Sequence, residues 1–182
     1  MIFRPTCLAA LSLSVLALSG CGKSDTVQAT NESAASVNEK LANSDLRMRP
    51  GKWESRMKID KLEMAGLPPE AAAQMQKAMG MEQTVATCIT QAQVEKPNTE
   101  MFKQASEGCQ YENFTMAGGK IDARMTCNRG PAPSRMVMSG TYGTDEYNVT
   151  MSTQAGAGAD MPMNMTMSVA SKRIGECDGK EG

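Results

Sequence analysis

Methionine is the residue type whose number and spacing in this sequence most suggest chemistry. The chain holds 17 Met against three Phe, three Tyr and one Trp. Thioether sulfurs are soft ligands for Cu(I) or Ag(I), and they are also flexible apolar groups that fill cores or line apolar cavities. One run alternates methionine with small polar residues at the two-residue period of a strand with one apolar face. Its methionines are Met161, Met163, Met165 and Met167.

Two further methionines, Met138 and Met151, lie in neighbouring predicted strands and extend this pattern. The candidate ligand or metal face therefore comprises Met163, Met165, Met167, Met151 and Met138. Strand alternation favours core packing for these side chains. An apolar ligand cavity and a Cu(I)/Ag(I) site are the two alternatives.

The composition argues against several classes of protein. Histidine is absent, which removes Ser-His and Cys-His nucleophile pairs, histidine metal sites and histidine general bases. The carboxylates are scattered singly, and no acid–base pair can be assembled from them. The balance of 19 basic against 20 acidic side chains does not fit a nucleic-acid-binding surface. We therefore expect a protein that is not an enzyme, with no catalytic residue, no cofactor and no nucleic-acid partner.

The N-terminus has the features of an export signal. Arg4 precedes an apolar run over 7–18 that is too short to span a bilayer, and the run closes with Leu18-Ser19-Gly20-Cys21. This ending is similar to the lipobox of bacterial lipoproteins, which implies cleavage before Cys21 and acylation of that residue. Gly22 follows the cysteine, which in enteric-type sorting favours the outer membrane. An ordinary signal peptide is the alternative.

The other cysteines indicate disulfides. Once Cys7 leaves with the signal and Cys21 is lipidated, an even set of four remains in an oxidising compartment, and three pairings are conceivable. A hairpin turn centred on Gly118 would place Cys109 and Cys127 equally far from the turn on adjacent strands. This register favours Cys109–Cys127 and leaves Cys88 to pair with Cys177.

The order of predicted elements gives the fold class and the domain limits. We expect a mainly β fold with minor α: an antiparallel meander of about seven strands, forming a curled sheet or half-barrel with two short covering helices. Strands are predicted over 52–59, 83–89, 109–116, 121–128, 134–142, 146–153 and 163–172. One helix is predicted to begin at Pro68-Pro69 and to end just before Gly80, a short helical turn to open at 90–93, and another short helix to lie between 98 and 108. The expected parts are a signal peptide (1–20), a lipidated cysteine with a disordered tether (21–48), one β domain (49–178) and a tail (179–182).

Several short motifs resemble a known family of bacterial envelope proteins, the domain-of-unknown-function family 3617. They are Gly51-Lys52-Trp53-Glu54, Cys88-Ile89-Thr90, Cys109, Gly118-Gly119 before Cys127, Gly140-Thr141-Tyr142 with Tyr147, and Lys172 to Cys177. Together they cover about residues 50–177. The resemblance implies an exported small domain, and it supplies no activity and no functional residues. Gln91, Lys172 and Glu176 depart from the usual family pattern.

The sequence thus predicts a non-catalytic periplasmic protein, held on the bacterial membrane by a lipid on Cys21. Its predicted partners are that membrane and either an apolar small molecule or lipid, or an envelope protein. The alternative is a periplasmic Cu(I)/Ag(I)-binding protein that uses the Met-rich strands. Trp53 is expected to anchor the core, and Lys172-Arg173 with Glu176 to form a charge pair at the end of the last strand.

Overall fold

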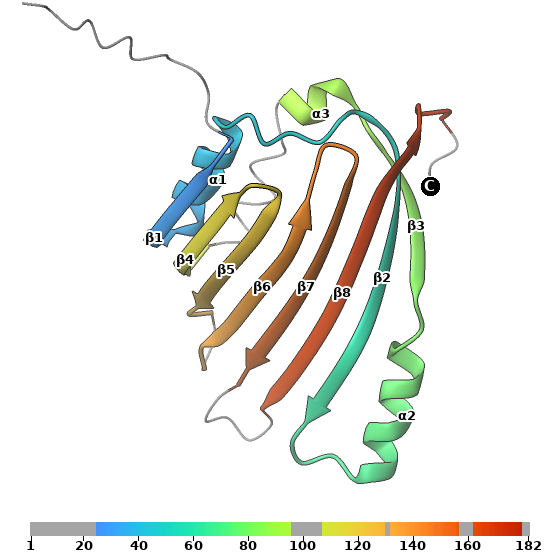
Figure 1. Ribbon diagram of the computed structural model, residues 1–182. Helices are drawn as coiled ribbons and strands as arrows, with labels where there is room; N and C mark the ends of the chain where they lie inside the picture. Colours follow the sequence, from blue (N-terminus) through green and yellow to red (C-terminus); the bar gives the residue numbers. More distant parts are fainter. Residues whose placement is uncertain (1–24, 96–106, 130–131, 157–161, 180–182) are drawn as a thin grey trace, which may run out of the picture.

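The computed structural model describes residues 25–95, 107–129, 132–156 and 162–179. The predicted signal peptide, Cys21, Met161 and most of the helix predicted between 98 and 108 lie outside these residues. One eight-stranded antiparallel sheet dominates the structure, with strand order β1-β4-β5-β6-β7-β8-β2-β3 (Figure 1). The sheet is not closed, because β1 and β3 form its two edges. The mainly β prediction is therefore confirmed.

The strands follow the predicted meander, with one strand added. They are β1 (Val27–Ser33), β2 (Gly51–Met64), β3 (Gln83–Ile89), β4 (Cys109–Ala117), β5 (Lys120–Cys127), β6 (Ser134–Tyr142), β7 (Glu146–Ala155) and β8 (Met163–Gly175). The helices are α1 (Ala34–Ala42), α2 (Pro69–Met79) and α3 (Gln91–Glu95). No helix among these described segments is both long and apolar enough to cross a membrane.

The turn between β4 and β5 has the geometry that its glycines predict. Ala117 pairs with Lys120, so Gly118 and Gly119 alone form the loop, with φ of 56° and 75°. Two consecutive positive φ angles match the right-handed twist of a hairpin and are readily adopted by glycine. This register alone would place Cys109 opposite Asn128, but it shifts by one residue between Tyr111 and Asn113, and this bulge brings Cys109 directly opposite Cys127.

The cysteines join in the predicted pairing. Cys109–Cys127 bridges adjacent strands with a Cα–Cα distance of 4.0 Å. Cys88–Cys177 has a Cα–Cα distance of 5.5 Å and joins residues 89 positions apart. In the chain-entropy account, closing so long a loop stabilises the fold by about 4–5 kcal/mol. This second bond fastens the edge strand β3 to the C-terminal end of β8.

The prediction of a disordered tether over 21–48 is wrong for residues 27–46. In that stretch β1 pairs antiparallel with β4, and α1 packs on the sheet. Ser33 caps the helix by accepting a hydrogen bond from the backbone N–H of Ser36 at 3.1 Å. Val37 is fully buried, and Leu41 packs beside it one helical turn later.

The fully packed core lies under α1. Val37 packs there with a cluster from β1, β4 and β5, namely Val27, Ala29, Phe114 and Ala123. The sequence predicts that short helices cover the sheet, but neither α2 nor α3 has a buried residue. α2 begins at Pro69 as predicted and contacts β2 at the lower margin of the sheet (Figure 1).

Strand β2 is longer than its first alternating run predicts. Trp53, Met57 and Ile59 point to one face, and the register against β8 then shifts between Ile59 and Lys61. Such a bulge adds one residue, so Leu62 and Met64 return to the same face as Ile59. The bulge thus extends the apolar face of β2 to the end of the strand.

Candidate functional site

One face of the sheet carries a continuous field of apolar side chains across β6, β7, β8 and β2. Register partners in an antiparallel sheet share a face, and alternate residues along each strand return to it. We call this surface the Met-rich face. Its residues are Met57, Ile59, Leu62 and Met64 of β2, Met136 and Met138 of β6, Val149 and Met151 of β7, and Met163, Met165, Met167 and Val169 of β8.

The central row of this face contains three of the five predicted site residues. Met138 is the register partner of Met151, which is the partner of Met167, and Ile59 of β2 continues the row. Directly opposed side chains have Cβ atoms about 4.5–5.5 Å apart, so these three thioethers are immediate neighbours. The row runs on into the core through Ala123, which pairs with Met138.

The remaining predicted site residues lie on the same face in the adjoining rows. Met165 pairs with Thr153 on one side and with Leu62 on the other. Met163 pairs with Ala155 and with Met64. The sheet therefore brings all five predicted methionines to one surface, with Met138 and Met163 at different ends of it.

These five methionines are half-buried, whereas the sequence favoured a buried core. The reason is the single-layer architecture: within the described chain, the principal helix contacts are those of α1 with β1 and β4 and of α2 with β2. These principal contacts of the described helices do not reach β7 or β8. Met138 packs against the edge of the core cluster, so the face passes from buried to half-buried without interruption.

Residues of β2 complete the face and were not among the predicted site residues. Met57 and Ile59 alternate visibly in the sequence, but nothing in one sequence shows that β2 pairs with β8. Leu62 and Met64 were missed because the bulge after Ile59 reverses the alternation. The signal available was the second alternating run, Lys61-Leu62-Glu63-Met64, displaced by one residue from the first.

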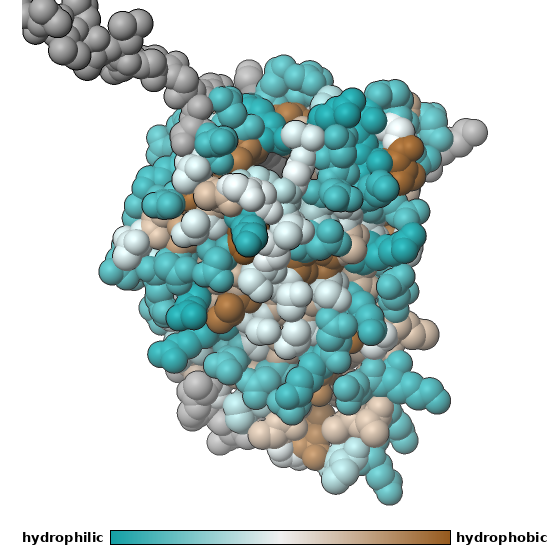
Figure 2. Space-filling view, in the orientation of Figure 1, coloured by the Kyte–Doolittle hydropathy of each residue, from teal (hydrophilic) through white to brown (hydrophobic). Residues whose placement is uncertain are grey.

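The opposite face of the sheet is polar. Figure 2 shows it as hydrophilic and pale side chains over the central strands. A hollow of about 420 Å³ lies on it, over β6, β7, β8 and β2. Arg56, Lys58, Glu82, Ser139, Asn148, Thr150, Ser168 and Ala170 line the hollow, together with Gly140, Val149 and Val169, which alternate with them along the strands and belong to the Met-rich face. Charged, hydroxyl and amide side chains alternate there with small and aliphatic residues, so the hollow offers both hydrogen-bonding groups and apolar surface.

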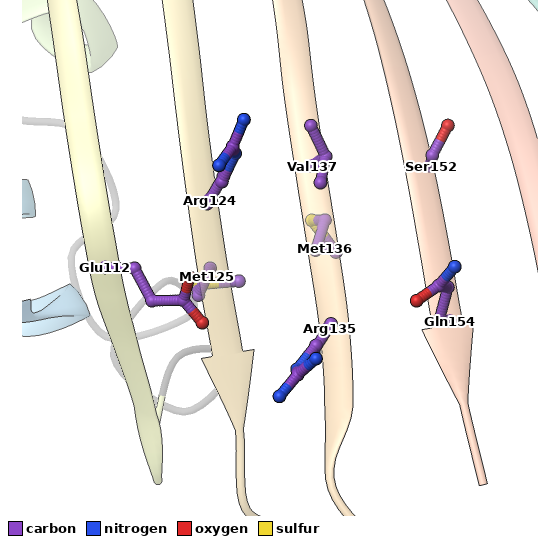
Figure 3. A pocket seen from close by; sticks show the side chains of 8 residues that line it. All are labelled: Glu112, Arg124, Met125, Arg135, Met136, Val137, Ser152 and Gln154. Atoms are coloured by element: carbon purple, nitrogen blue, oxygen red, sulfur yellow. The ribbon is translucent and has the colours of Figure 1, made fainter. Parts of the chain in front are cut away.

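A second hollow, of about 380 Å³, lies over β4 to β7 (Figure 3). Its lining residues are Glu112, Arg124, Met125, Arg135, Met136, Val137, Ser152 and Gln154. Two guanidinium groups and one carboxylate surround it, and Glu112 accepts a hydrogen bond from the Thr126 hydroxyl at 2.8 Å. This arrangement contains no nucleophile activated by a neighbouring base.

Trp53 is a packing anchor, as expected from its position. It is 1% exposed, its indole N–H donates to the backbone oxygen of Arg49 at 2.9 Å, and its ring stacks on Tyr147 with centroids 6.2 Å apart. The hydrogen bond satisfies its one polar atom, so the residue presents no free group to a ligand.

Charged residues at the end of β8 bind the backbone at the start of β2. Arg173 donates through Nε to the backbone oxygen of Pro50 at 2.7 Å and forms an ion pair with Glu176. Gly51 has φ of 137°, and a Cβ on it would lie 2.4 Å from the backbone oxygen of Gly175. Position 51 therefore requires glycine. The Arg173 side chain is held by the Pro50 backbone oxygen and by Glu176, so it serves the packing of β2 against β8.

The titratable groups with perturbed pKa lie away from the Met-rich face. The pKa of Glu32 is lowered because its carboxylate accepts hydrogen bonds from Lys40 and Ser36. Burial raises the pKa of Tyr111, whose ring meets Phe114 edge to face. In the part of the chain that the structure describes, no three His, Cys, Asp or Glu side chains are grouped to hold a metal ion.

Comparison with known families identifies the domain. The family described as "Protein of unknown function (DUF3617)" matches residues 48–177. The chain belongs to the DUF3617 family. No curated protein and no solved structure matches it.

The DUF3617 match includes seven of the eight described strands and leaves out β1. The match begins at residue 48, so it covers β2 to β8 and ends beside Cys177. β1 and α1 precede it, yet they pair with β4 and contribute Val27, Ala29 and Val37 to the core cluster. The Met-rich face lies wholly within the DUF3617 domain. The segment before the domain adds β1 to the sheet and places α1 against β1 and β4, beside the Met-rich face.

Proposed function

We propose that the protein is a non-catalytic lipoprotein of the bacterial envelope, and that its Met-rich face binds one acyl chain of a lipid. The observation that carries the proposal is the central row Met138–Met151–Met167–Ile59, which is apolar throughout and half-buried. Apolar side chains that stay partly exposed side by side on several strands are a common feature of interaction sites.

The shape of the face supports an extended apolar ligand. The row from Ala123 to Ile59 crosses five strands, which at about 4.8 Å per strand is about 19 Å. The face bears no charged side chain. Flexible thioethers let such a surface adapt to chains of different shape.

Interleaved aliphatic residues favour a lipid over a metal ion. Ile59, Leu62, Val149 and Val169 lie among the methionines, and their side chains cannot ligate a metal. A Cu(I) site needs only a few converging sulfurs, whereas an acyl chain uses the whole surface. The aliphatic residues are therefore accounted for only by an apolar ligand or by packing.

Displacement of a fluorescent fatty acid tests the lipid proposal. Replacing Met151 and Met167 together by Thr removes apolar surface from the central row, so we expect the dissociation constant for a dansyl-labelled fatty acid to rise at least tenfold. Val137→Thr, on the opposite face, is the matched control and should leave binding unchanged. Equal affinity in all three proteins would refute binding at this face.

The second candidate function is Cu(I) or Ag(I) binding, and the three register partners Met138, Met151 and Met167 favour it. Met151→Leu separates the two functions because it keeps the volume and the apolar surface but removes one sulfur. The lipid proposal predicts unchanged fatty-acid affinity in this variant. Stoichiometric Cu(I) uptake in the wild type that is weakened in Met151→Leu would favour the metal instead.

The proposed location rests on Leu18-Ser19-Gly20-Cys21. Acylation there would hold the protein on the periplasmic side of a membrane, with Gly22 favouring the outer one. Several acyl chains form a stable anchor where one does not. A palmitate analogue should label the wild type and not Cys21→Ser, and a Ser variant that stays in the membrane fraction would refute the anchor.

A further inference from the structure

The last strand at one margin of the sheet, β3, pairs within the described residues on one side only, with β2 (Figure 1). In an antiparallel ladder a strand directs its backbone N–H and C=O groups alternately to its two sides. Its outer side is therefore a template for a further strand. Cys88, near the end of β3, is held to Cys177, so this edge is fixed against the rest of the sheet.

The other edge of the sheet has features that protect it from pairing. β1 contains Glu32, and Asn31 has φ of 55°, which interrupts the regular strand. Lys40 of α1 donates to the backbone oxygen of Gln28 at 3.3 Å and forms an ion pair with Glu32. Charged side chains and irregular backbone are the usual devices that block edge-to-edge association.

β3 has none of these devices. Its sequence, Gln-Thr-Val-Ala-Thr-Cys-Ile, contains no charged residue and no proline, and the register against β2 is regular throughout. Two β-branched threonines and a valine give it high strand propensity. An uncharged, regular and rigid edge is what a second strand needs in order to pair.

Exposed apolar side chains gather along the chain beside this edge. Val85 of β3 is 40% exposed, and Met79 and Met81, which lead into the strand, are 43% and 69% exposed. Figure 2 shows apolar side chains among hydrophilic ones at the lower right, where Figure 1 places α2, the helix that precedes β3. Pairing at β3 would cover part of this surface.

We propose that β3 pairs antiparallel with β3 of a second copy of the chain, about a two-fold axis at Ala86, so that one sheet continues through both molecules. Self-pairing places Val85 opposite Thr87 of the second copy and Gln83 opposite Ile89, and no like charges meet. A two-fold contact of this kind closes on itself and does not propagate into fibres. This inference is independent of the proposed ligand.

The contact is short, so the dimer should depend on concentration. Seven residues per copy bury less than the roughly 1,200 Å² at which stable interfaces begin. We expect a weak association that sedimentation velocity detects as a shift from monomer to dimer as the protein is concentrated. Backbone pairing should also slow amide hydrogen exchange in the peptide 83–89 at the higher concentration.

Two lysine variants of the mature chain, each carrying Cys21→Ser to keep it soluble, test the proposal. Val85→Lys puts a charge on the edge and should raise the dimer dissociation constant at least tenfold. Val137→Lys is the matched control, because Val137 is also exposed (43%) but lies on β6 inside the sheet, and it should dimerise like the parent chain. Thr84→Lys repeats the test on the other face of β3 if Val85→Lys does not fold.

Concentration-dependent dimerisation and slowed exchange in 83–89, both lost in the β3 variant and retained in the control, would support the pairing. A parent chain that stays monomeric at all concentrations would overturn it. A dimer that survives the folded β3 variants, or that both valine variants weaken equally, would also overturn it.

Discussion

Replacing Val37 by alanine is the sharpest test of the N-terminal segment, whose composition suggests disorder. Val37 is fully buried between α1 and the sheet. Removing two methyl groups loses about 1.6 kcal/mol of transfer free energy at ~0.8 kcal/mol each, and the cavity left behind adds to this. Alanine returns about 0.5 kcal/mol of helix propensity. The net loss should be about 1.5–2.5 kcal/mol.

Urea unfolding with the disulfides intact measures this change. Val137→Ala is the control, because Val137 is exposed on the sheet surface and its loss should cost at most ~1 kcal/mol. If residues 27–46 were a free tether, Val37→Ala would leave the midpoint unchanged. An unchanged midpoint would therefore refute the packing of α1 on the sheet.

Two other perturbations follow from the same contacts. Gly140→Ala should destabilise the β6–β7 pair by about 1–3 kcal/mol, because a Cβ would lie 2.0 Å from the backbone oxygen of Asn148. Gly175→Ala has open space and should be nearly neutral; equal urea midpoints in the two variants would count against this register. The pKa of Glu32 is lowered in the folded state by its hydrogen bond from Lys40. Its ionised carboxylate should therefore stabilise the fold above about pH 4.5, and this stabilisation should be lost as the pH falls through the folded-state pKa. In Glu32→Gln the urea midpoint should fall less between pH 7 and pH 3 than in the wild type. A fall as large as that of the wild type would contradict this.

The fold was most predictable where the information is local. Consecutive glycines at 118 and 119 specify a two-residue hairpin turn, which brings Cys109 and Cys127 to within one residue of each other, and a bulge between Tyr111 and Asn113 completes their alignment. The observed limits of β3 and β6 match the strands predicted over 83–89 and 134–142. Such features need no knowledge of distant partners.

The parts that were missed depend on distant partners or on irregular geometry. β1 offers only Val27 and Ala29 as apolar residues, and they become buried because β4, far along the chain, pairs with them. α1 has only Ala34, Val37 and Leu41 on its packed side, which is too short a pattern to outweigh the polar composition around it. Tertiary contacts decide both elements.

The candidate site was predictable as a set of residues but not as a surface. Alternation placed Met163, Met165 and Met167 on one side of a strand, and the structure agrees. The exposed fraction of these side chains depends on which elements cover the sheet. The alternation of apolar and polar residues along a strand carries no information about that. The contribution of β2 to the face depends on a bulge and on the pairing of β2 with β8.

The most direct test of the account is native mass spectrometry of the protein purified from its own membranes. We predict one retained lipid per chain, in addition to the covalent anchor, which is lost when Met151 and Met167 are both replaced by Thr and kept in Val137→Thr. Loss of the lipid with an unchanged fold would locate the ligand at the Met-rich face. A wild-type chain that carries no lipid, or that carries copper or silver in its place, would contradict the central claim.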